Sequence, residues 1–402
     1  MEQTLVDLFC GAGGLSRGLS DAGFVPLYAN ELQERYSQTY QQNHPGTWVE
    51  TGDIRLIDAT DVRQRLGLSR GDLDLLAGGP PCQGFSINAP KRSTGDKRNH
   101  LFHEFLRFAK EFVPKAVLIE NVPGLVSFQK GETLSAIIQM LSELGYRSDV
   151  QILYAPYFGV PQTRWRTVII GFREDIDPLQ AFPKPQVFAP ARVNFTSRFK
   201  DRSLLQLPPV AAPTSSHTTV MQALGDLPRL DNGEFGAEIK DYVCLPQNGF
   251  QRAVRRDSTG VTNHEAARLS AVNMERLKFI PPGGNWTDIP YELRPLGMQR
   301  ARLSDHTKRY GRVEPDGLAS TILTKCDPHW GAYFHYDQDR AFTVREAARL
   351  QSFPDSYHFT GSRVEQYAQV GNAVPPFLAA AVGRSILKEL LASDRSPIAL
   401  AA

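Results

Sequence analysis

The chain has 402 residues, which exceeds the usual size of one domain and predicts two. Its 41% hydrophobic, 22% charged and 10% aromatic residues exclude a disordered, collagen-like or coiled-coil protein. No apolar run approaches the roughly 18 residues of a membrane span, and the start does not resemble a signal sequence. Four cysteines are too few for a disulfide framework, so we expect free thiols and a cytoplasmic protein.

The net charge of +2 is unevenly distributed along the chain. Residues 181–335 carry 20 lysines and arginines against 15 acidic residues, whereas the rest of the chain carries 25 against 28. A basic segment in a slightly acidic chain is typical of a module that faces a polyanion. An ordinary solvated surface explains the same numbers, so charge alone identifies no partner.

The first 175 residues alternate short apolar runs with amphipathic patterns. Strands are predicted at residues 5–9, 25–29, 73–77, 117–120 and 167–172. Helices are predicted at residues 15–22, 102–112 and 134–141, with Gly23 ending the first. This alternation predicts a parallel sheet with helices on both faces, in which ligands bind beyond the carboxyl ends of the strands.

A proline-rich stretch follows, with six prolines between Pro183 and Pro213, and it predicts a linker or an extended wrap. The chain is then irregular to about residue 335, and its clearest loop is 281–286. Two helices, at 343–350 and after Pro375-Pro376, restore the regular pattern. The sequence therefore predicts a second domain inserted between two parts of the first.

Residues 7–14, with the sequence DLFCGAGG, join the first predicted strand to the first helix. Glycines let a ligand approach the backbone here, but the G-x-G-G spacing differs from the dinucleotide motif because residue 16 is Ser. Glu31, at the second strand end, could bind a ribose diol, and Asp53 could accept from an adenine amino group. Together they predict a nucleoside pocket, although each alone is typical of a turn or a cap.

Residues 78–86, with the sequence GGPPCQGFS, place Cys82 after a strand in a rigid turn. A lone cysteine is usually a small buried hydrophobe, but a thiolate beside cations is a nucleophile. The loop 88–100 has four Lys and Arg residues against one Asp. It could supply positive charge beside the thiolate and cover the site. Glu120, in the sequence ENV, would face the same crevice.

The sequence QTRWR, residues 162–166, puts Arg164 and Arg166 at alternate positions entering a strand, so both are predicted to point to one side. One could bind Glu120 or a base carbonyl, and the other Gln162 or backbone. A surface ion pair of little energetic value is the simpler interpretation.

The order of these motifs, followed by REAARLQSFPD and QVGNAVPP, resembles the bacterial DNA cytosine-5 methyltransferases over roughly residues 1–175 and 340–390. PPCQ, ENV and GNAVPP form a specific combination. The resemblance implies an α/β fold with a doubly wound, mostly parallel, Rossmann-like sheet of the S-adenosylmethionine-dependent methyltransferase type. It also implies a second, smaller, irregular target-recognition domain. We place the catalytic domain at residues 1–182 and 366–402, and the target-recognition domain with its hinges at 183–365.

The resemblance also implies the chemistry. Cys82 would attack carbon 6 of a flipped-out cytosine, since carbon 5 is a poor nucleophile until a thiolate adds to the ring. Glu120 would bind ring nitrogen 3 and the exocyclic amine, and Arg166 the base carbonyl. The remaining expected catalytic residues are Arg164, Gln162 and Ser86.

S-adenosylmethionine is the expected methyl donor and S-adenosylhomocysteine the product. Phe9 would pack on the adenine, Glu31 would bind the ribose and Asp53 the adenine amine, and Asn372 would complete the pocket. Leu32 stands where many relatives have an aromatic residue, so we expect stacking to depend more on Phe9. The other expected cofactor contacts are Gly11, Gly13, Gly14, Leu15, Ile54, Pro80, Leu101 and Val374.

The expected partner is double-stranded DNA of a specific sequence, methylated by a monomeric, cytoplasmic enzyme at the bacterial nucleoid. A cognate restriction endonuclease acting separately would make the chain part of a restriction-modification system. Candidate DNA contacts are Asn88, Arg98, Arg252, Arg255, Arg256 and Arg300, together with Asn285, Trp286 and Arg302.

Three alternatives are open. A transfer-RNA methyltransferase of the same family is disfavoured by the long middle segment and by Gly84-Phe85-Ser86 after PCQ. A nucleotide-dependent oxidoreductase is disfavoured by the G-x-G-G spacing. A catalytically idle DNA-binding relative is disfavoured by the intact nucleophile and cofactor motifs.

Overall fold

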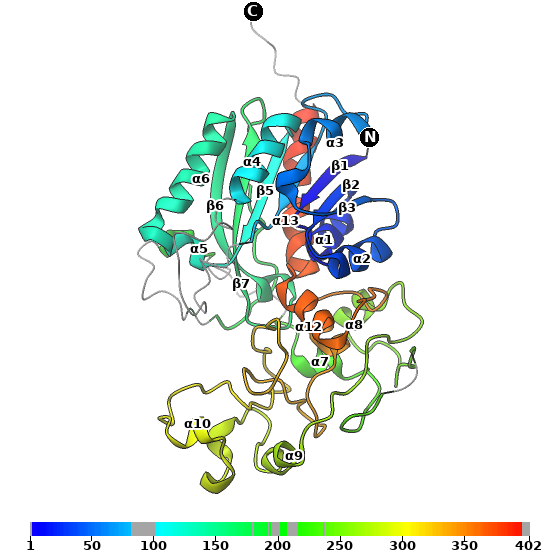
Figure 1. Cartoon of the computed structure of the whole chain (residues 1–402), viewed down its shortest axis with the longest axis vertical. Coiled ribbons are helices and arrows are strands. Elements are labelled where there is room, and N and C mark those ends of the chain that lie inside the picture. Colours follow the sequence, from blue (N-terminus) through cyan, green and yellow to red (C-terminus); the bar gives the residue numbers. More distant parts are fainter. Residues whose placement is uncertain are drawn as a thin grey trace, which may run out of the picture. The chain divides into compact units, whose positions relative to one another are not determined.

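The structure, a computed structural model, describes residues 2–81, 101–178, 181–191, 193, 202–206, 216–235 and 238–395. The chain divides into two compact units. The first unit consists of residues 1–158, 165–213 and 374–402, and the second of residues 159–164 and 214–373. Both ends of the chain thus build one unit and its middle builds the other (Figure 1). These bounds differ from our domain boundaries, because residues 183–213 fall in the first unit and residues 159–164 and 366–373 in the second.

The first unit is built on a seven-stranded sheet with strand order β3-β2-β1-β4-β5-β7-β6. Its strands are β1 (Gln3–Leu8), β2 (Phe24–Glu31), β3 (Trp48–Thr51), β4 (Leu75–Gly78), β5 (Ala116–Asn121), β6 (Tyr146–Tyr154) and β7 (Trp165–Arg173). The five strands that the sequence predicted are all present. The prediction of a mostly parallel sheet is confirmed, and the exception is β7, which runs antiparallel to β5 and β6. A short connection joins β6 to β7, and without a crossover helix only an antiparallel pairing is possible.

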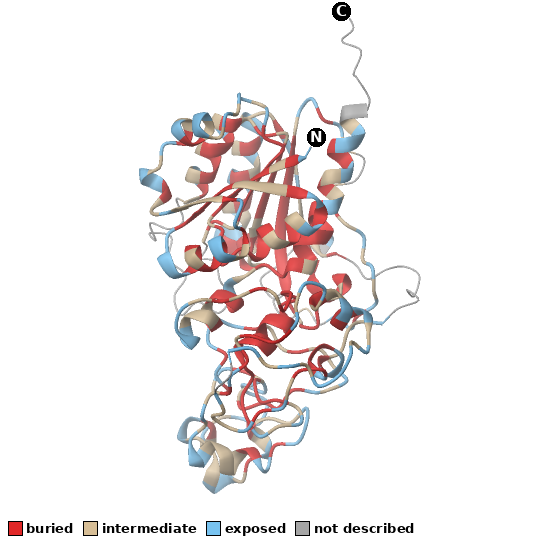
Figure 2. Ribbon diagram, turned by 90° about the vertical axis from the view of Figure 1, so that its right-hand side faces the viewer, coloured by how far each residue is buried: buried red, intermediate tan, exposed pale blue. Residues whose placement is uncertain are grey.

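Helices flank both faces of this sheet, whose strands are largely buried (Figure 2). They are α1 (Gly14–Ala22), α2 (Glu34–Asn43), α3 (Ala59–Arg65), α4 (Leu101–Phe112), α5 (Gly124–Ser127), α6 (Glu132–Glu143) and α13 (Pro376–Arg395). The predicted helices α1, α4, α6 and α13 are confirmed. Gly23 ends α1 with φ 114°, a backbone conformation that favours glycine.

The stretch Arg363–Ser393 is long and apolar enough to cross a membrane by composition alone. However, 72% of its most apolar 18-residue segment is buried inside the protein, as is usual for a core helix of a globular protein.

Gly18 marks the closest approach of α1 and α13. A Cβ atom at this position would lie 2.3 Å from the Pro376 carbonyl oxygen and 2.5 Å from Ala379 Cβ. We expect Gly18→Ala to lower the free energy of unfolding by about 1–3 kcal/mol, because overpacking outweighs the higher helix propensity of alanine. Denaturant unfolding measures this effect. Gly46→Ala is the control, since a Cβ there meets no atom within 4 Å; equal midpoints for both variants would contradict the packing argument.

The second unit contains short helices, α7 (Val220–Leu224), α8 (Gly249–Val254), α9 (Ala271–Leu277), α10 (Leu296–Gln299), α11 (Val344–Leu350) and α12 (Arg363–Asn372). Its described residues form isolated bridges rather than a sheet. One of its cores surrounds Trp286, which is fully buried and donates its indole N–H to the Asp305 carbonyl at 3.0 Å. The expectation that Trp286 contacts a base is therefore wrong, because the side chain fills the core.

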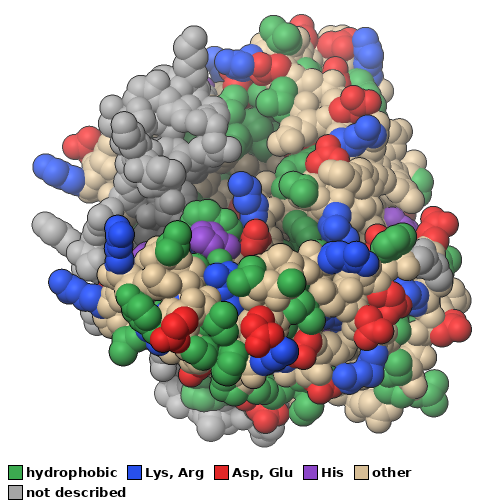
Figure 3. All heavy atoms as spheres, turned by 60° about the horizontal axis from the view of Figure 1, so that its bottom comes forward, with side chains coloured by type: hydrophobic (Ala, Val, Ile, Leu, Met, Phe, Trp, Pro, Cys, Tyr) green, Lys and Arg blue, Asp and Glu red, His purple; other side chains and the backbone are tan. Residues whose placement is uncertain are grey.

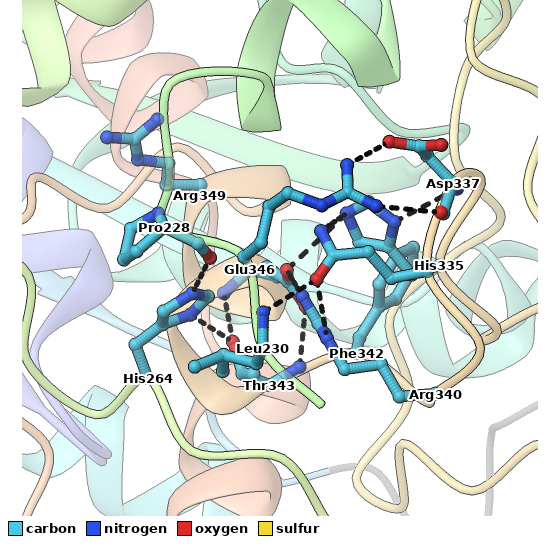
Figure 4. A network of polar contacts seen from close by, with 12 residues as sticks. Pro228, Leu230, His264, His335, Asp337, Arg340, Phe342, Thr343, Glu346 and Arg349 are labelled. Atoms are coloured by element: carbon cyan, nitrogen blue, oxygen red, sulfur yellow. Dashed lines mark hydrogen bonds and ion pairs between the residues drawn. The ribbon is translucent and has the colours of Figure 1, made fainter. Parts of the chain in front are cut away.

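The REAARLQSFPD segment forms α11 and carries buried charges (Figure 4). Arg340 donates to both Glu346 carboxylate oxygens, at 2.7 and 2.8 Å. His264 joins the Pro228 carbonyl, at 2.8 Å, to Thr343 at the start of α11, at 2.9 Å. These contacts hold three distant segments of the chain together.

We expect this unit to lose stability as the pH falls from about 6.5 to about 4. Burial lowers the pKa of His335 from 6.5 to about 4, so in this range the unfolded chain binds a proton that the folded chain does not. The cost is at most about 3 kcal/mol, at 1.4 kcal/mol per pKa unit. Although burial alone would raise it, Arg340 holds the pKa of Glu346 well below its usual value, which adds to the loss in acid.

Unfolding midpoints at about pH 7 and about pH 4.5 test this prediction. His335→Gln should show a weaker pH dependence than the parent protein, whereas His103→Gln, on the exposed surface of α4, should leave it unchanged. An unchanged pH dependence in His335→Gln would contradict the assignment.

Candidate active site

The glycine turn between β1 and α1 lies where the strand order of the sheet reverses, beside β4. Such switch points form the ligand crevices of doubly wound sheets. Gly11 and Gly13 have φ 57° and 88°, and Phe9, a non-glycine residue, has φ 58°. This conformation costs Phe9 on the order of 1–2 kcal/mol, and such strain is concentrated at functional sites.

Glu31 holds this turn from the end of β2. Its two carboxylate oxygens accept hydrogen bonds from the backbone N–H of Gly11 at 3.0 Å and of Gln33 at 2.9 Å. Burial raises the pKa of Glu31, while the backbone donors oppose that rise. Its carbonyl accepts from Gly52 at 2.9 Å, so Asp53 is fixed nearby. The side-chain hydrogen bond from Arg55 lowers the pKa of Asp53, and the two groups form an ion pair.

A buried series of side-chain hydrogen bonds, which we did not predict from the sequence, lies behind the glycine turn. Tyr40 donates to Ser16 at 2.7 Å, and Ser16 donates to Asp7 Oδ2 at 2.6 Å. Asp7 Oδ1 has no hydrogen-bond partner among the described residues, and burial raises the pKa of Asp7 to about 7. Because Asp7 is fully buried, no ligand atom reaches it, so its role is to position the start of α1. The feature of the sequence that could have revealed these hydrogen bonds is the acidic residue Asp7 inside a predicted buried strand.

The residues around the turn fit S-adenosylmethionine. A Cβ at Gly11 would meet no atom within 4 Å, which leaves open space above the turn. Leu32 and Leu56 follow Glu31 and Asp53 and are 67% and 87% exposed, so apolar surface lies beside both carboxylates. An adenosine group needs this combination of apolar contact and diol acceptor. Leu15 and Ile54 are buried, and Asn372 is exposed in the second unit.

The turn that leads to Cys82 is anchored by the end of β5. Asn121, which is buried, donates from Nδ2 to the Pro80 carbonyl at 3.1 Å. A Cβ at Gly79 would lie 3.3 Å from Glu120 Oε2, so the Glu120 carboxylate lies against the backbone that enters the loop. The predicted residues Cys82, Ser86, Asn88 and Arg98 lie outside the described residues.

Glu120 forms an ion pair with Arg166 across the antiparallel β5–β7 pair, with Arg166 Nε 2.5 Å from Glu120 Oε1. Both side chains are largely buried. Burial lowers the pKa of Arg166, and the Glu120 charge opposes that shift. The arginine therefore orients the Glu120 carboxyl group in a largely buried site, where hydrogen bonds are stronger than in water.

Gln162 and Arg164 belong to the second unit and are almost completely buried. Gln162 donates to the Leu350 carbonyl at 2.7 Å, and its own oxygen accepts from Ile322 at 3.0 Å. Arg164 donates to the carbonyls of Ile322, Gly371 and Ala373. Arg164 thus binds backbone, as the alternate spacing of the two arginines allowed, and Gln162 does so too. Direct catalytic roles for these two residues stay predictions. Their use of internal partners explains why residues 159–164 group with the second unit.

Residues 3–388 match the family model of the C-5 cytosine-specific DNA methylases. The chain belongs to this family. It is a DNA (cytosine-5) methyltransferase, and its fold is the Rossmann-like fold of that class.

The similar proteins agree with this assignment. The Type II methyltransferase M.AgeI of Thalassovita gelatinovora is 33% identical, over 95% of this chain and 98% of that protein. M.DdeI of Desulfomicrobium norvegicum is 36% identical, over 95% and 88%. A prophage-encoded E. coli protein assigned as a DNA modification methyltransferase has a TM-score of 0.72 at 24% identity, covering 97% of this chain and 99% of that one. This last likeness shows the fold alone.

Among the predicted DNA contacts of this methyltransferase, Arg255 has an internal role. It pairs with the buried Asp226 at 2.8 Å, and its guanidinium lies 3.6 Å from the centre of the Tyr242 ring. Its Nη1 thus serves the second unit, and a contact between Arg255 and DNA stays a prediction. Arg252, Arg256, Arg300 and Arg302 are exposed.

Proposed function

We propose that this methyltransferase modifies carbon 5 of a cytosine flipped out of a specific double-stranded DNA sequence, with S-adenosylmethionine as methyl donor and Cys82 as covalent nucleophile. The observation that supports this most strongly is the Glu120–Arg166 pair, which lies against the Gly79-Pro80 backbone leading into Cys82. A buried, paired carboxylate beside a nucleophile is the arrangement that activation of a pyrimidine ring requires.

In the proposed mechanism, the Cys82 thiolate forms a bond from Sγ to carbon 6 of the cytosine. The Glu120 carboxyl group donates a proton to nitrogen 3 and accepts from the exocyclic amine, so the electron pair displaced from the 5,6 double bond forms an enamine in which carbon 5 is nucleophilic. Arg166 keeps Glu120 oriented, and it binds the base carbonyl. S-adenosylmethionine, when bound, supplies an electrophilic methyl group. Solvent water then takes the proton from carbon 5, the 5,6 double bond re-forms, and the bond between Sγ and carbon 6 breaks and releases the thiolate.

For the cofactor, Glu31 would bind the ribose diol, and Phe9, Leu32 and Leu56 would supply the apolar contacts to the adenine. The open space at Gly11 would accept the methionine part. The second unit would recognise the DNA, and its contacts to phosphate would offset the few kcal/mol that base flipping costs. We further propose that the protein acts as a monomer at the bacterial nucleoid, and that it is the modification enzyme of a restriction-modification system.

Competition between DNA and transfer RNA tests the proposal. Purified protein is incubated with labelled S-adenosylmethionine and equal concentrations of mixed-sequence DNA and transfer RNA. We expect label in the DNA, with binding of the cofactor measured separately by calorimetry. Label in the RNA instead would overturn the substrate assignment.

A further inference from the structure

Two segments of the second unit, residues 300–309 and 325–330, lie side by side. The backbone N–H of Tyr310 donates to the Pro328 carbonyl at 2.6 Å, and Tyr310 Oη lies 2.9 Å from His329 Nδ1. The two segments carry five cations and two carboxylates. The cations are Arg300, Arg302, Lys308, Arg309 and Lys325, and together with Trp330 we call them the 300–330 patch.

The cations of the 300–330 patch are not neutralised. Neither carboxylate pairs with them through its side chain: Asp305 accepts from the backbone N–H of Arg302 at 3.3 Å, and Asp327 from that of His329 at 2.9 Å. No carboxylate in the described part of the chain forms an ion pair with any of the five. Elsewhere, exposed arginines such as Arg65 and Arg229 do have such partners.

The overall sign of the surface does not single out this patch. On the face shown in Figure 3, Lys and Arg side chains are interspersed with Asp, Glu and hydrophobic ones. The patch is therefore distinguished by bringing five cations without a carboxylate partner onto two adjacent segments, which leaves their charge available to a polyanion.

Trp330 and Arg309 give the patch a defined geometry. Trp330 is 49% exposed, and the Arg309 guanidinium lies 4.9 Å from the centre of its ring. The His329 ring contacts Trp330 edge-on, with ring centres 4.8 Å apart. Stacking on an indole restricts an arginine side chain but leaves its N–H groups available. Arg309 is therefore preorganised to present its planar donors to a ligand.

Hydrogen bonds hold the segment that leads into this patch. The segment before Lys325 is bound by Arg164, which donates to the Ile322 carbonyl at 3.0 Å, and by Thr163, whose N–H donates to the Ala319 carbonyl at 2.8 Å. Tyr333 closes the loop, because its hydroxyl donates to the Thr321 carbonyl at 3.0 Å. The segment that leads into the loop 325–330 is therefore held in place within the second unit.

We infer that the 300–330 patch is the surface that reads the DNA sequence, with Arg309, held on Trp330, donating to the edge of a guanine in the major groove. This rests on the proposed function. The arginine fork matches the O6 and N7 acceptors of guanine, whereas the other four cations contact phosphate and carry no sequence information.

Sequence discrimination and the salt dependence of binding distinguish the proposed base contact of Arg309 from the phosphate contacts of the other cations. The recognition sequence is first obtained by bisulfite sequencing of DNA methylated by the parent protein. Methylation rates and affinities are then measured on the recognised sequence, on each single-base variant of it, and over a range of salt concentrations. The variants are Arg309→Lys, Trp330→Ala and Lys308→Ala, with melting temperature and cofactor affinity as checks of folding.

Arg309→Lys and Trp330→Ala should reduce discrimination at one G·C pair by about tenfold or more, since a bidentate base contact is lost. Lys308→Ala should weaken binding to all sequences alike. It should also reduce the magnitude of the slope of log affinity against log salt concentration by about 1. The matched control is Arg65→Lys, because Arg65 also lies over a tryptophan, Trp48, at 5.6 Å, but belongs to the first unit and pairs with Asp61. Arg65→Lys should change neither the sequence discrimination nor the salt dependence of binding.

Unchanged discrimination in Arg309→Lys and Trp330→Ala would overturn the inference, as would a uniform loss of affinity in Arg309→Lys, which indicates a phosphate contact. Absence of DNA methylation by the parent protein would instead overturn the proposed function.

Discussion

Glu120→Gln is expected to lower kcat for methyl transfer by about 10²–10⁴-fold, the usual contribution of a positioned acid–base group. Glutamine keeps the shape of the side chain but removes the proton that the carboxyl group delivers to nitrogen 3 of the base, and it removes the charge that pairs with Arg166 at 2.5 Å. The buried Arg166 is then left without its counter-charge, which adds a cost in stability. Single-turnover rates with labelled cofactor measure the chemical step directly.

The control for this variant is Glu111→Gln in α4, which removes an ion pair with Arg63 of α3, remote from the strand ends of the site. It should retain nearly full activity. Cofactor affinity should be unchanged in both variants, because Glu120 does not belong to the nucleoside pocket. A rate for Glu120→Gln within about twofold of the parent protein would show that the carboxylate does not activate the base.

Cys82→Ala is expected to reduce methyl transfer by about 10⁴-fold or more, since no other group is proposed to form the covalent bond to carbon 6. Binding of S-adenosylmethionine and of DNA should persist, because the thiol contributes little to either. Cys244→Ala is the matched control, as Cys244 is an exposed free thiol of the second unit. DNA containing 5-fluorocytosine should trap a covalent complex with the parent protein and with Cys244→Ala, but not with Cys82→Ala. A trapped complex with Cys82→Ala would contradict the assignment of the nucleophile.

The sheet was predictable where its strands are buried on both faces. The strands β1, β4 and β5 are short apolar runs because parallel central strands contact helices on either side. The strand β6 escaped prediction because it is an edge strand whose residues alternate between buried and exposed, with Arg147 and Asp149 in its first half. Its antiparallel partner β7 was found, but the direction of β7 could not be read from an apolar run.

The site was predictable where one residue type carries the chemistry, as for Glu120 and Arg166. The supporting contacts were not, since they depend on which distant atoms meet. Asn121 binds the Pro80 carbonyl, Asp7 lies behind the glycine turn, and Gln162 binds segments nearly 190 residues away in the chain. Trp286 and Arg255 resembled surface contacts in the sequence, but tertiary packing buries one and pairs the other.

The most direct test of the central claim is the identity of the methylated base. DNA incubated with the purified protein and S-adenosylmethionine is digested to nucleosides and analysed by mass spectrometry with authentic standards. We predict 5-methylcytosine as the product, absent when Cys82→Ala replaces the parent protein. Methyl groups on an exocyclic nitrogen, as in N4-methylcytosine or N6-methyladenine, or undiminished 5-methylcytosine with Cys82→Ala, would contradict the account.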